Sequence, residues 1–132
     1  LNLNERIKFF SNLNQDDLRK TYCESEIAVV PSLYEGFGFA AIEAMACGIP
    51  LVSSSGGALP EVIKDAGIII PPKDSEEIFN SIKLILSSPD ISDKLIAKAL
   101  KRVNSKFSWK VIAEKLEKIY QKEIEKFKYA NN

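Results

Sequence analysis

Histidine is absent from this chain of 132 residues, and its absence excludes two kinds of chemistry. Neither a Ser-His-Asp nor a Cys-His catalytic arrangement can form, and the commonest side chain of metal sites is missing. Cysteine is scarce, because Cys23 and Cys47 are the only two, which is too few for a disulfide scaffold. No apolar run reaches the roughly 18 residues that cross a bilayer. Basic and acidic residues number 18 each, so a net charge of zero attracts the chain neither to nucleic acid nor to an acidic membrane.

Short apolar runs alternate with helical segments through the first half of the chain. Strands are expected over four ranges: 7–10, 27–30, 50–53 and 67–70. Helices are expected between them over 16–24, 39–46 and 60–64, the first with Asn14 as its cap. Because the strand runs are largely apolar without alternation, they are typical of a parallel sheet that is buried on both faces. The sequence therefore predicts an α/β fold with an open, parallel, Rossmann-like sheet.

The second half of the chain is expected to be helical. Segments 75–86 and 91–103 each carry apolar residues on one helical face. Ser108 is expected to cap a long last helix from Trp109 onward, whose apolar stripe covers this domain. Three further apolar residues extend the stripe beyond the domain: Ile124, Phe127 and Tyr129.

A glycine-containing loop follows the second expected strand, within the stretch PSLYEGFGFAAIEAMACGIP. The loop lies at the carboxyl end of the sheet, where open α/β folds hold their ligands. Gly36 and Gly38 let a ligand approach the backbone, and the helix that begins at Phe39 offers unpaired N–H groups suited to a phosphate. The alternative is that the two glycines only shape a turn. The residues alone leave both interpretations open.

Glu43 is the single carboxylate in this apolar helix, and we expect it to be buried. A buried carboxylate needs a partner, since leaving it unpaired costs several kcal/mol. One candidate is a structural cation such as Arg19, and the other is a ligand with two adjacent hydroxyls. Glu43 lies about 6 Å along the helix from Phe39, which suits a phosphate at the helix start and a sugar diol one turn further on.

The letters of residues 36–41 also fit the dinucleotide fingerprint G-x-G-x-x-A. In that fingerprint the first glycine follows the strand directly, whereas residues 31–35 intervene here. It also requires an acidic residue about 20 positions further on, where this chain has Ser53-Ser54-Ser55-Gly56-Gly57. The sequence therefore argues against a dehydrogenase.

Residues 31–50 resemble the signature of the retaining GT-B glycosyltransferases of family 4, P-S-x-x-E-G-F-G-x-x-x-x-E-A-M-A-x-G-x-P. The resemblance continues through residues 55–61, 67–74 and 107–109, so it covers nearly the whole chain. It implies the C-terminal donor-binding domain of such an enzyme, truncated at its N-terminal side and followed by C-terminal helices.

The resemblance also implies two parts of the chain. Residues 1–108 are expected to belong to the nucleotide-sugar-binding domain. Residues 109–132 are expected to form an amphipathic helix that packs back toward a missing N-terminal domain. Because the chain begins at Leu1 rather than methionine, we expect it to be a piece of a longer enzyme.

The family's residue roles carry over onto the matching positions. Glu35 is the first glutamate of the E-x7-E motif and is expected to act near the reaction centre as the catalytic residue. The backbone amides of Gly36, Phe37, Gly38 and Phe39 are expected to hold the donor sugar and its diphosphate. Glu43, the second glutamate, is expected to bind the ribose hydroxyls. No metal or other cofactor is expected, since in this family positive side chains and helix N–H groups stabilise the departing diphosphate.

The implied donor is a sugar linked to UDP, GDP or ADP, transferred with retention to a sugar, lipid or glycan that the missing domain holds. We expect no nucleic-acid partner and at most peripheral contact with a membrane. The expected location is the cytoplasm, including the inner face of the membrane. The family's arginine and lysine clamp lies upstream of residues 7–10, so this chain alone is expected to be inactive. Ser11 and Asn12 replace a glycine near the nucleobase, so base contacts are not carried over. The alternative is a non-catalytic module that binds sugar nucleotides or has a regulatory role.

Overall fold

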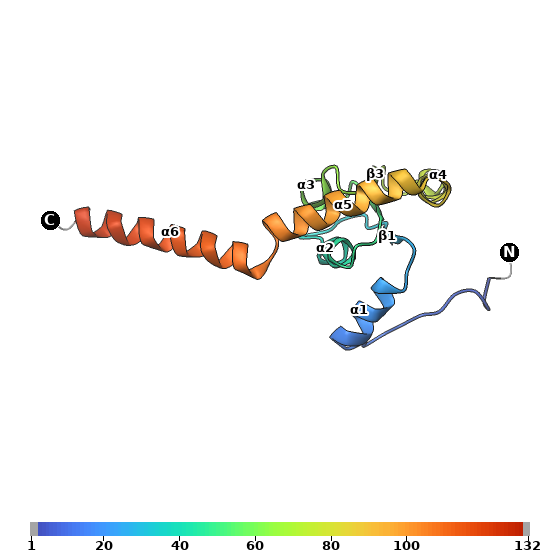
Figure 1. The fold of residues 1–132 in the computed structure, drawn as a ribbon, viewed down its shortest axis with the longest axis horizontal. Helices are drawn as coiled ribbons and strands as arrows, with labels where there is room; N and C mark the ends of the chain where they lie inside the picture. The colour runs from blue at the N-terminus through green and yellow to red at the C-terminus, as the bar shows by residue number, and fades with distance from the viewer. Residues whose placement is uncertain (1–2, 131–132) are drawn as a thin grey trace.

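The computed structural model describes residues 3–130, without the side chains of residues 129 and 130. Figure 1 shows an α/β body with α6 extending from it to the left and α1 lying below it. The strands are β1 (Ala28–Val30), β2 (Leu51–Ser54) and β3 (Ile68–Ile70). The helices are α1 (Gln15–Cys23), α2 (Phe39–Ala46), α3 (Leu59–Ile63), α4 (Ser75–Ser87), α5 (Pro89–Lys106) and α6 (Trp109–Ala130).

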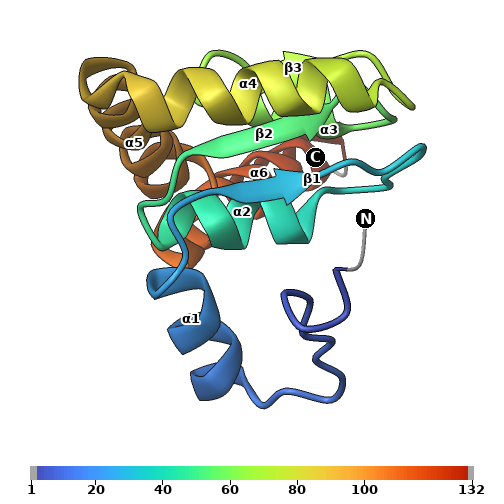
Figure 2. The same ribbon diagram turned by 90° about the vertical axis from the view of Figure 1, so that its right-hand side faces the viewer.

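The sheet is parallel throughout, with β2 between β1 and β3. Helix α2 packs on one face of the sheet and α4 on the other, as Figure 2 shows, and α5 contacts both helices. Successive strand residues point to opposite faces, so Leu51 joins the apolar cluster under α2 and Val52 joins the cluster under α4. Burial on both faces explains the unbroken apolar runs and confirms the predicted fold class.

The predicted strand at residues 7–10 is wrong. This segment makes no ladder hydrogen bond to β1 among the described residues, and the Phe9 and Phe10 side chains are 93% and 60% exposed. A strand added at β1 would need apolar cover on its own faces to offset the entropy of ordering it. In the described part of the chain no element supplies that cover, so the sheet ends at β1.

The two outer helices match their predicted positions. Asn14 caps α1, because its side chain accepts a hydrogen bond of 2.8 Å from the Asp17 backbone N–H. Helix α6 begins at Trp109 and runs away from the body (Figure 1). Its stripe does not cover this domain as predicted, since Trp109 is 86% exposed and Ile119 59% exposed. Of the outer apolar residues, Ile124 and Phe127 are also mostly exposed, and Tyr129 lies outside the described side chains.

None of the helices within residues 3–130 combines the length and apolarity that crossing a membrane requires.

Candidate functional site

The glycine loop lies where the sequence predicts it, between the end of β1 at Val30 and the start of α2 at Phe39. All three strands are parallel, so this loop and the start of α3 meet at the carboxyl edge of the sheet. The Ala58 N–H donates a hydrogen bond of 2.9 Å to the Glu35 carbonyl, which ties the loop to the residues before α3. Glu35 itself is half-buried at this junction.

The two loop glycines have different roles. Gly38 has a φ of +87°, and a Cβ added to it would lie 3.2 Å from Leu59 Cδ2. The turn into α2 therefore requires glycine at this position for its conformation and for its packing. A Cβ added to Gly36 would meet nothing within 4 Å. The space beside Gly36 is open, so a ligand can approach the backbone there.

The first turn of α2 presents unpaired donors. Gly38 is the N-cap and offers no side-chain hydrogen bond, and the first backbone bond of the helix runs from Ile42 N–H to the Gly38 carbonyl. Among the described residues, the N–H groups of Phe39, Ala40 and Ala41 have no backbone or side-chain acceptor. Such donors and the positive end of the helix dipole suit an anion.

Glu43 is exposed, so the expectation that it is buried is wrong. Helix α1 contacts α2 beside Glu43, and a cavity of about 180 Å³ remains between the two helices. The Tyr22 hydroxyl donates a hydrogen bond of 3.4 Å to Glu43 Oε2. Arg19 lines the same cavity, but no salt bridge joins Arg19 to Glu43 in the described part of the chain.

Tyr22 is the partner that sequence analysis missed. Burial raises the pKa of its hydroxyl above the usual value, and the neighbouring Glu43 carboxylate raises it further. The hydroxyl therefore stays protonated and remains a donor to Glu43. No local pattern identifies this contact, since the two residues are 21 positions apart on different helices.

A serine pair also fixes the loop. Ser54 Oγ donates to the Ser32 carbonyl, and Ser53 Oγ donates to the Val30 carbonyl at 3.3 Å. Both serines are buried at the end of β2, next to the loop. In the sequence they counted only as the absence of an acidic residue, whereas in the fold they hold the loop that carries Glu35.

A parallel sheet with helices on both faces, with a glycine loop and a free helix start at its carboxyl edge, is the arrangement of an α/β domain that binds an anionic ligand at that edge. Residues 1–102 match the family described as glycosyl transferases group 1. The chain belongs to this family.

Similar proteins are glycosyltransferases. The MMP alpha-(1->4)-mannosyltransferase of Mycolicibacterium hassiacum is 35% identical over 94% of this chain and 31% of its own length. The structure of sucrose-phosphate synthase from Thermosynechococcus elongatus is 34% identical over 93% of this chain and 31% of that one, with a TM-score of 0.83. HepE from Anabaena, solved with UDP-glucose, has the same fold with a TM-score of 0.82 and 22% identity, over 91% of this chain and 33% of its own. The chain thus spans about a third of the length of these proteins.

Proposed function

We propose that this chain is part of the donor-binding domain of a retaining glycosyltransferase of family 4, whose donor is a sugar linked to UDP, GDP or ADP. One observation carries the proposal. The free N–H groups of Phe39 to Ala41 stand between two carboxylates on the same segment, Glu35 before them and Glu43 one turn after. An anion at the helix start and hydroxyl groups on either side are the parts of one molecule, a nucleotide sugar.

In this proposal each group has one task. The N–H groups at the start of α2 hold the diphosphate, and the open side of Gly36 lets the sugar approach the backbone. Glu35 contacts the donor sugar near the reaction centre as the catalytic residue, and the amides of Gly36 to Phe39 complete the cradle. Glu43 accepts hydrogen bonds from the two ribose hydroxyls with the oxygen atoms that Tyr22 leaves open.

The leaving diphosphate is stabilised by helix N–H groups rather than by a metal or other cofactor. In the full-length enzyme, an arginine and a lysine upstream add positive charge, and an N-terminal domain holds the acceptor. Helix α6 packs back toward that domain. The chain by itself does not catalyse transfer, because both the clamp and the acceptor domain are needed to form the transition state.

The relatives support the transferase class. The mannosyltransferase from Mycolicibacterium hassiacum transfers a hexose, as its name states, and it is similar over nearly all of this chain. HepE holds UDP-glucose on the same fold, which supports the donor class at the level of the fold. The second candidate, a sugar-nucleotide-binding module without catalysis, shares the donor site and differs only in lacking turnover.

A thermal-shift screen with UDP, GDP, ADP and their sugar conjugates tests the proposal. A site for a nucleotide sugar predicts that one nucleotide raises the melting temperature of the chain, and that its free nucleoside does so much less. Absence of a shift with all three nucleotides at millimolar concentration would contradict it. Turnover by the full-length protein, measured with and without Glu35→Ala, separates the enzyme from the non-catalytic module.

A further inference from the structure

A second cavity lies on the other side of the glycine loop from Glu43. Its volume is about 460 Å³, and it is bounded by Gly36 and Phe37, by α3, and by the corner where α5 meets α6. It shares no lining residue with the cavity that contains Glu43 and Tyr22, which lies between α1 and α2. Figure 1 shows α2 between these two regions. Of these two cavities, the second is the one that borders the loop, through Gly36 and Phe37.

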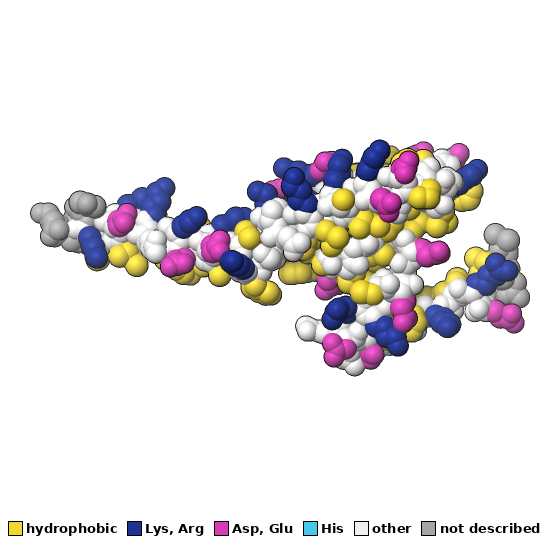
Figure 3. All heavy atoms as spheres, viewed as in Figure 1, with side chains coloured by type: hydrophobic (Ala, Val, Ile, Leu, Met, Phe, Trp, Pro, Cys, Tyr) yellow, Lys and Arg dark blue, Asp and Glu magenta, His cyan; other side chains and the backbone are white. Residues whose placement is uncertain are grey.

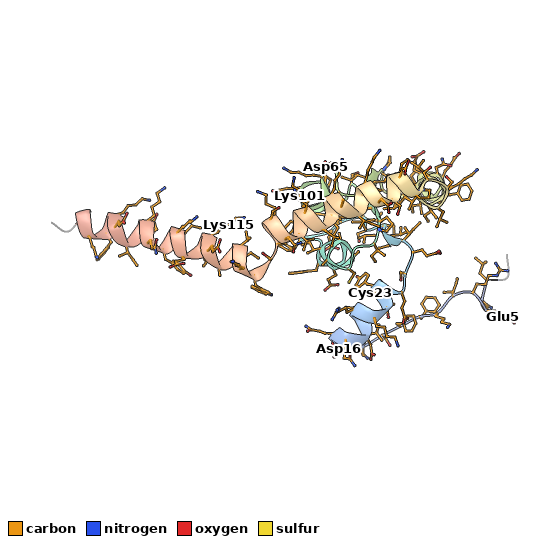
Figure 4. All side chains as sticks on the ribbon, viewed as in Figure 1. Glu5, Asp16, Cys23, Asp65, Lys101 and Lys115 are labelled. Carbon is orange, nitrogen blue, oxygen red and sulfur yellow. The ribbon has the colours of Figure 1, made fainter. Side chains whose placement is uncertain are left out.

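The second cavity is strongly cationic although the chain as a whole has no net charge. Four cationic residues and one carboxylate line it: Lys64, Arg102, Lys106, Lys115 and Glu61. In Figure 3 lysine and arginine side chains gather over α5 and the beginning of α6, and Figure 4 places Lys115 on α6 near this corner. The positive side chains come from α5, from α6 and from Lys64, which directly follows α3, so folding gathers them although the sequence separates them.

Arg102 has a structural task within this group. Its guanidinium donates to the Val62 carbonyl at 2.5 Å and to the Glu61 carbonyl at 2.6 Å, and it lies 5.7 Å from the centre of the Phe107 ring. The three lysines have no such task. None of the salt bridges found within residues 3–130 involves Lys64, Lys106 or Lys115. Their ammonium groups are thus available to a ligand.

We propose that this cavity binds a phosphate monoester carried by the acceptor, the rest of which the N-terminal domain holds in the proposed function. Three ammonium groups around one space favour a group with about two negative charges, which a monoester has near neutral pH and a diester lacks. The volume suits a sugar-sized molecule. Phe37 and Gly36 border the cavity, so a molecule held there reaches the loop where the donor sugar lies in the proposed function. The nucleoside lies on the Glu43 side, which leaves this side to the acceptor.

The cavity and its lysines alone support the anion site, whereas its assignment to the acceptor rests on the proposed function. Glucose 6-phosphate is the probe, titrated into the 132-residue chain at low ionic strength and followed by calorimetry. The test variant is the double substitution Lys106→Gln and Lys115→Gln. The matched control is Lys101→Gln with Lys118→Gln, on the same two helices and with the same loss of charge, at positions that do not line the cavity. All four lysines are exposed, so both variants should keep the wild-type melting temperature.

Glucose 6-phosphate is expected to bind, glucose and dimethyl phosphate at least about tenfold more weakly, and the test variant to lose at least about tenfold in affinity for the monoester. The control variant should lose less than about twofold. Equal losses in both variants, equal affinity for dimethyl phosphate, or no binding of the monoester would overturn the proposal. A parallel titration with the nucleotide chosen by the thermal-shift screen reports on the proposed function separately. That nucleotide should bind beside glucose 6-phosphate and bind equally to both variants. Competition between the two ligands would assign the cavity to the donor diphosphate and overturn the acceptor assignment.

Discussion

The hydroxyl of Tyr22 lies 3.4 Å from Oε2 of Glu43 and links α1 to α2 at the edge of the smaller cavity. The same hydroxyl lies 3.5 Å from the Ala40 carbonyl, so it is held by α2 at two points. Glu43 is exposed, yet its carboxylate is oriented by this contact. The oxygen atoms that face the solvent remain available to hydroxyl groups of a ligand.

Tyr22 gives the stability of the chain a pH dependence. Its pKa is raised in the folded state, first by burial and then by Glu43. The unfolded tyrosine ionises near pH 10, so the stabilising contribution is complete below about pH 10 and is lost as the pH rises through the folded pKa. Tyr22→Phe should therefore flatten the fall in the free energy of unfolding above about pH 10. Urea denaturation of both proteins between about pH 8 and pH 12 measures this, and the other tyrosines cancel in the difference. Parallel profiles would contradict the prediction.

Substitution of the two loop glycines should affect the stability of the chain differently. Gly38→Ala places a side chain at a φ of +87° and 3.2 Å from Leu59 Cδ2, so the free energy of unfolding should fall by about 1–2 kcal/mol. Gly36→Val meets open space and should change stability by less than about 0.5 kcal/mol.

Nucleotide-sugar binding tests whether the donor approaches the backbone beside Gly36. Gly36→Val should abolish the thermal shift of the donor while the chain stays folded, because the side chain occupies the approach to the backbone. A folded Gly36→Val chain that binds the donor like the wild type would show that the sugar does not approach there.

Arg102 is expected to be a stability residue. Arg102→Lys keeps the charge but loses the planar fork that reaches the carbonyls of Glu61 and Val62, so the free energy of unfolding should fall by about 1–2 kcal/mol. Lys101→Arg, one residue earlier on the exposed side of α5, is the control and should have no measurable effect. Chemical denaturation measures both, and equal stabilities of Arg102→Lys and wild type would refute the assigned role.

Local patterns predicted the fold well where local forces decide it. The runs at β2 and β3 were expected as buried strands, and Leu51 and Val52 show why, since each packs under a different helix. The cap at Asn14 and the start of α2 at Phe39 also follow from short-range chemistry. The segment at residues 7–10 is also largely apolar but has no cover in the described part of the chain, and composition does not reveal what covers a strand.

The site was predicted only in part for a related reason. An apolar helix around Glu43 suggested burial, but the sequence does not say which helical face lies against a neighbour. The contact of Tyr22 with Glu43, the bond from Ser54 to Ser32 and the cavity lysines all join residues far apart in sequence. Such groups come together only through the packing of helices and loops on the sheet.

In the proposed function, Glu43 binds the ribose of a nucleotide donor, and a pair of variants tests this role. The variants are Glu43→Gln and, as the matched control, Glu76→Gln, an exposed glutamate on α4 that lines none of the described cavities around the loop. The ligands are the nucleoside diphosphate that gives the largest thermal shift and its 2′,3′-dideoxy analogue. Calorimetry of every protein with both ligands completes a double-mutant cycle.

Glu43→Gln is expected to weaken binding of the ribonucleotide by about 1.5–3 kcal/mol, the usual contribution of hydrogen bonds to a charged group. Binding of the dideoxy analogue should be nearly the same in the wild type, Glu43→Gln and Glu76→Gln. Equal losses for both ligands, or no loss for either, would show that Glu43 does not hold the ribose hydroxyls.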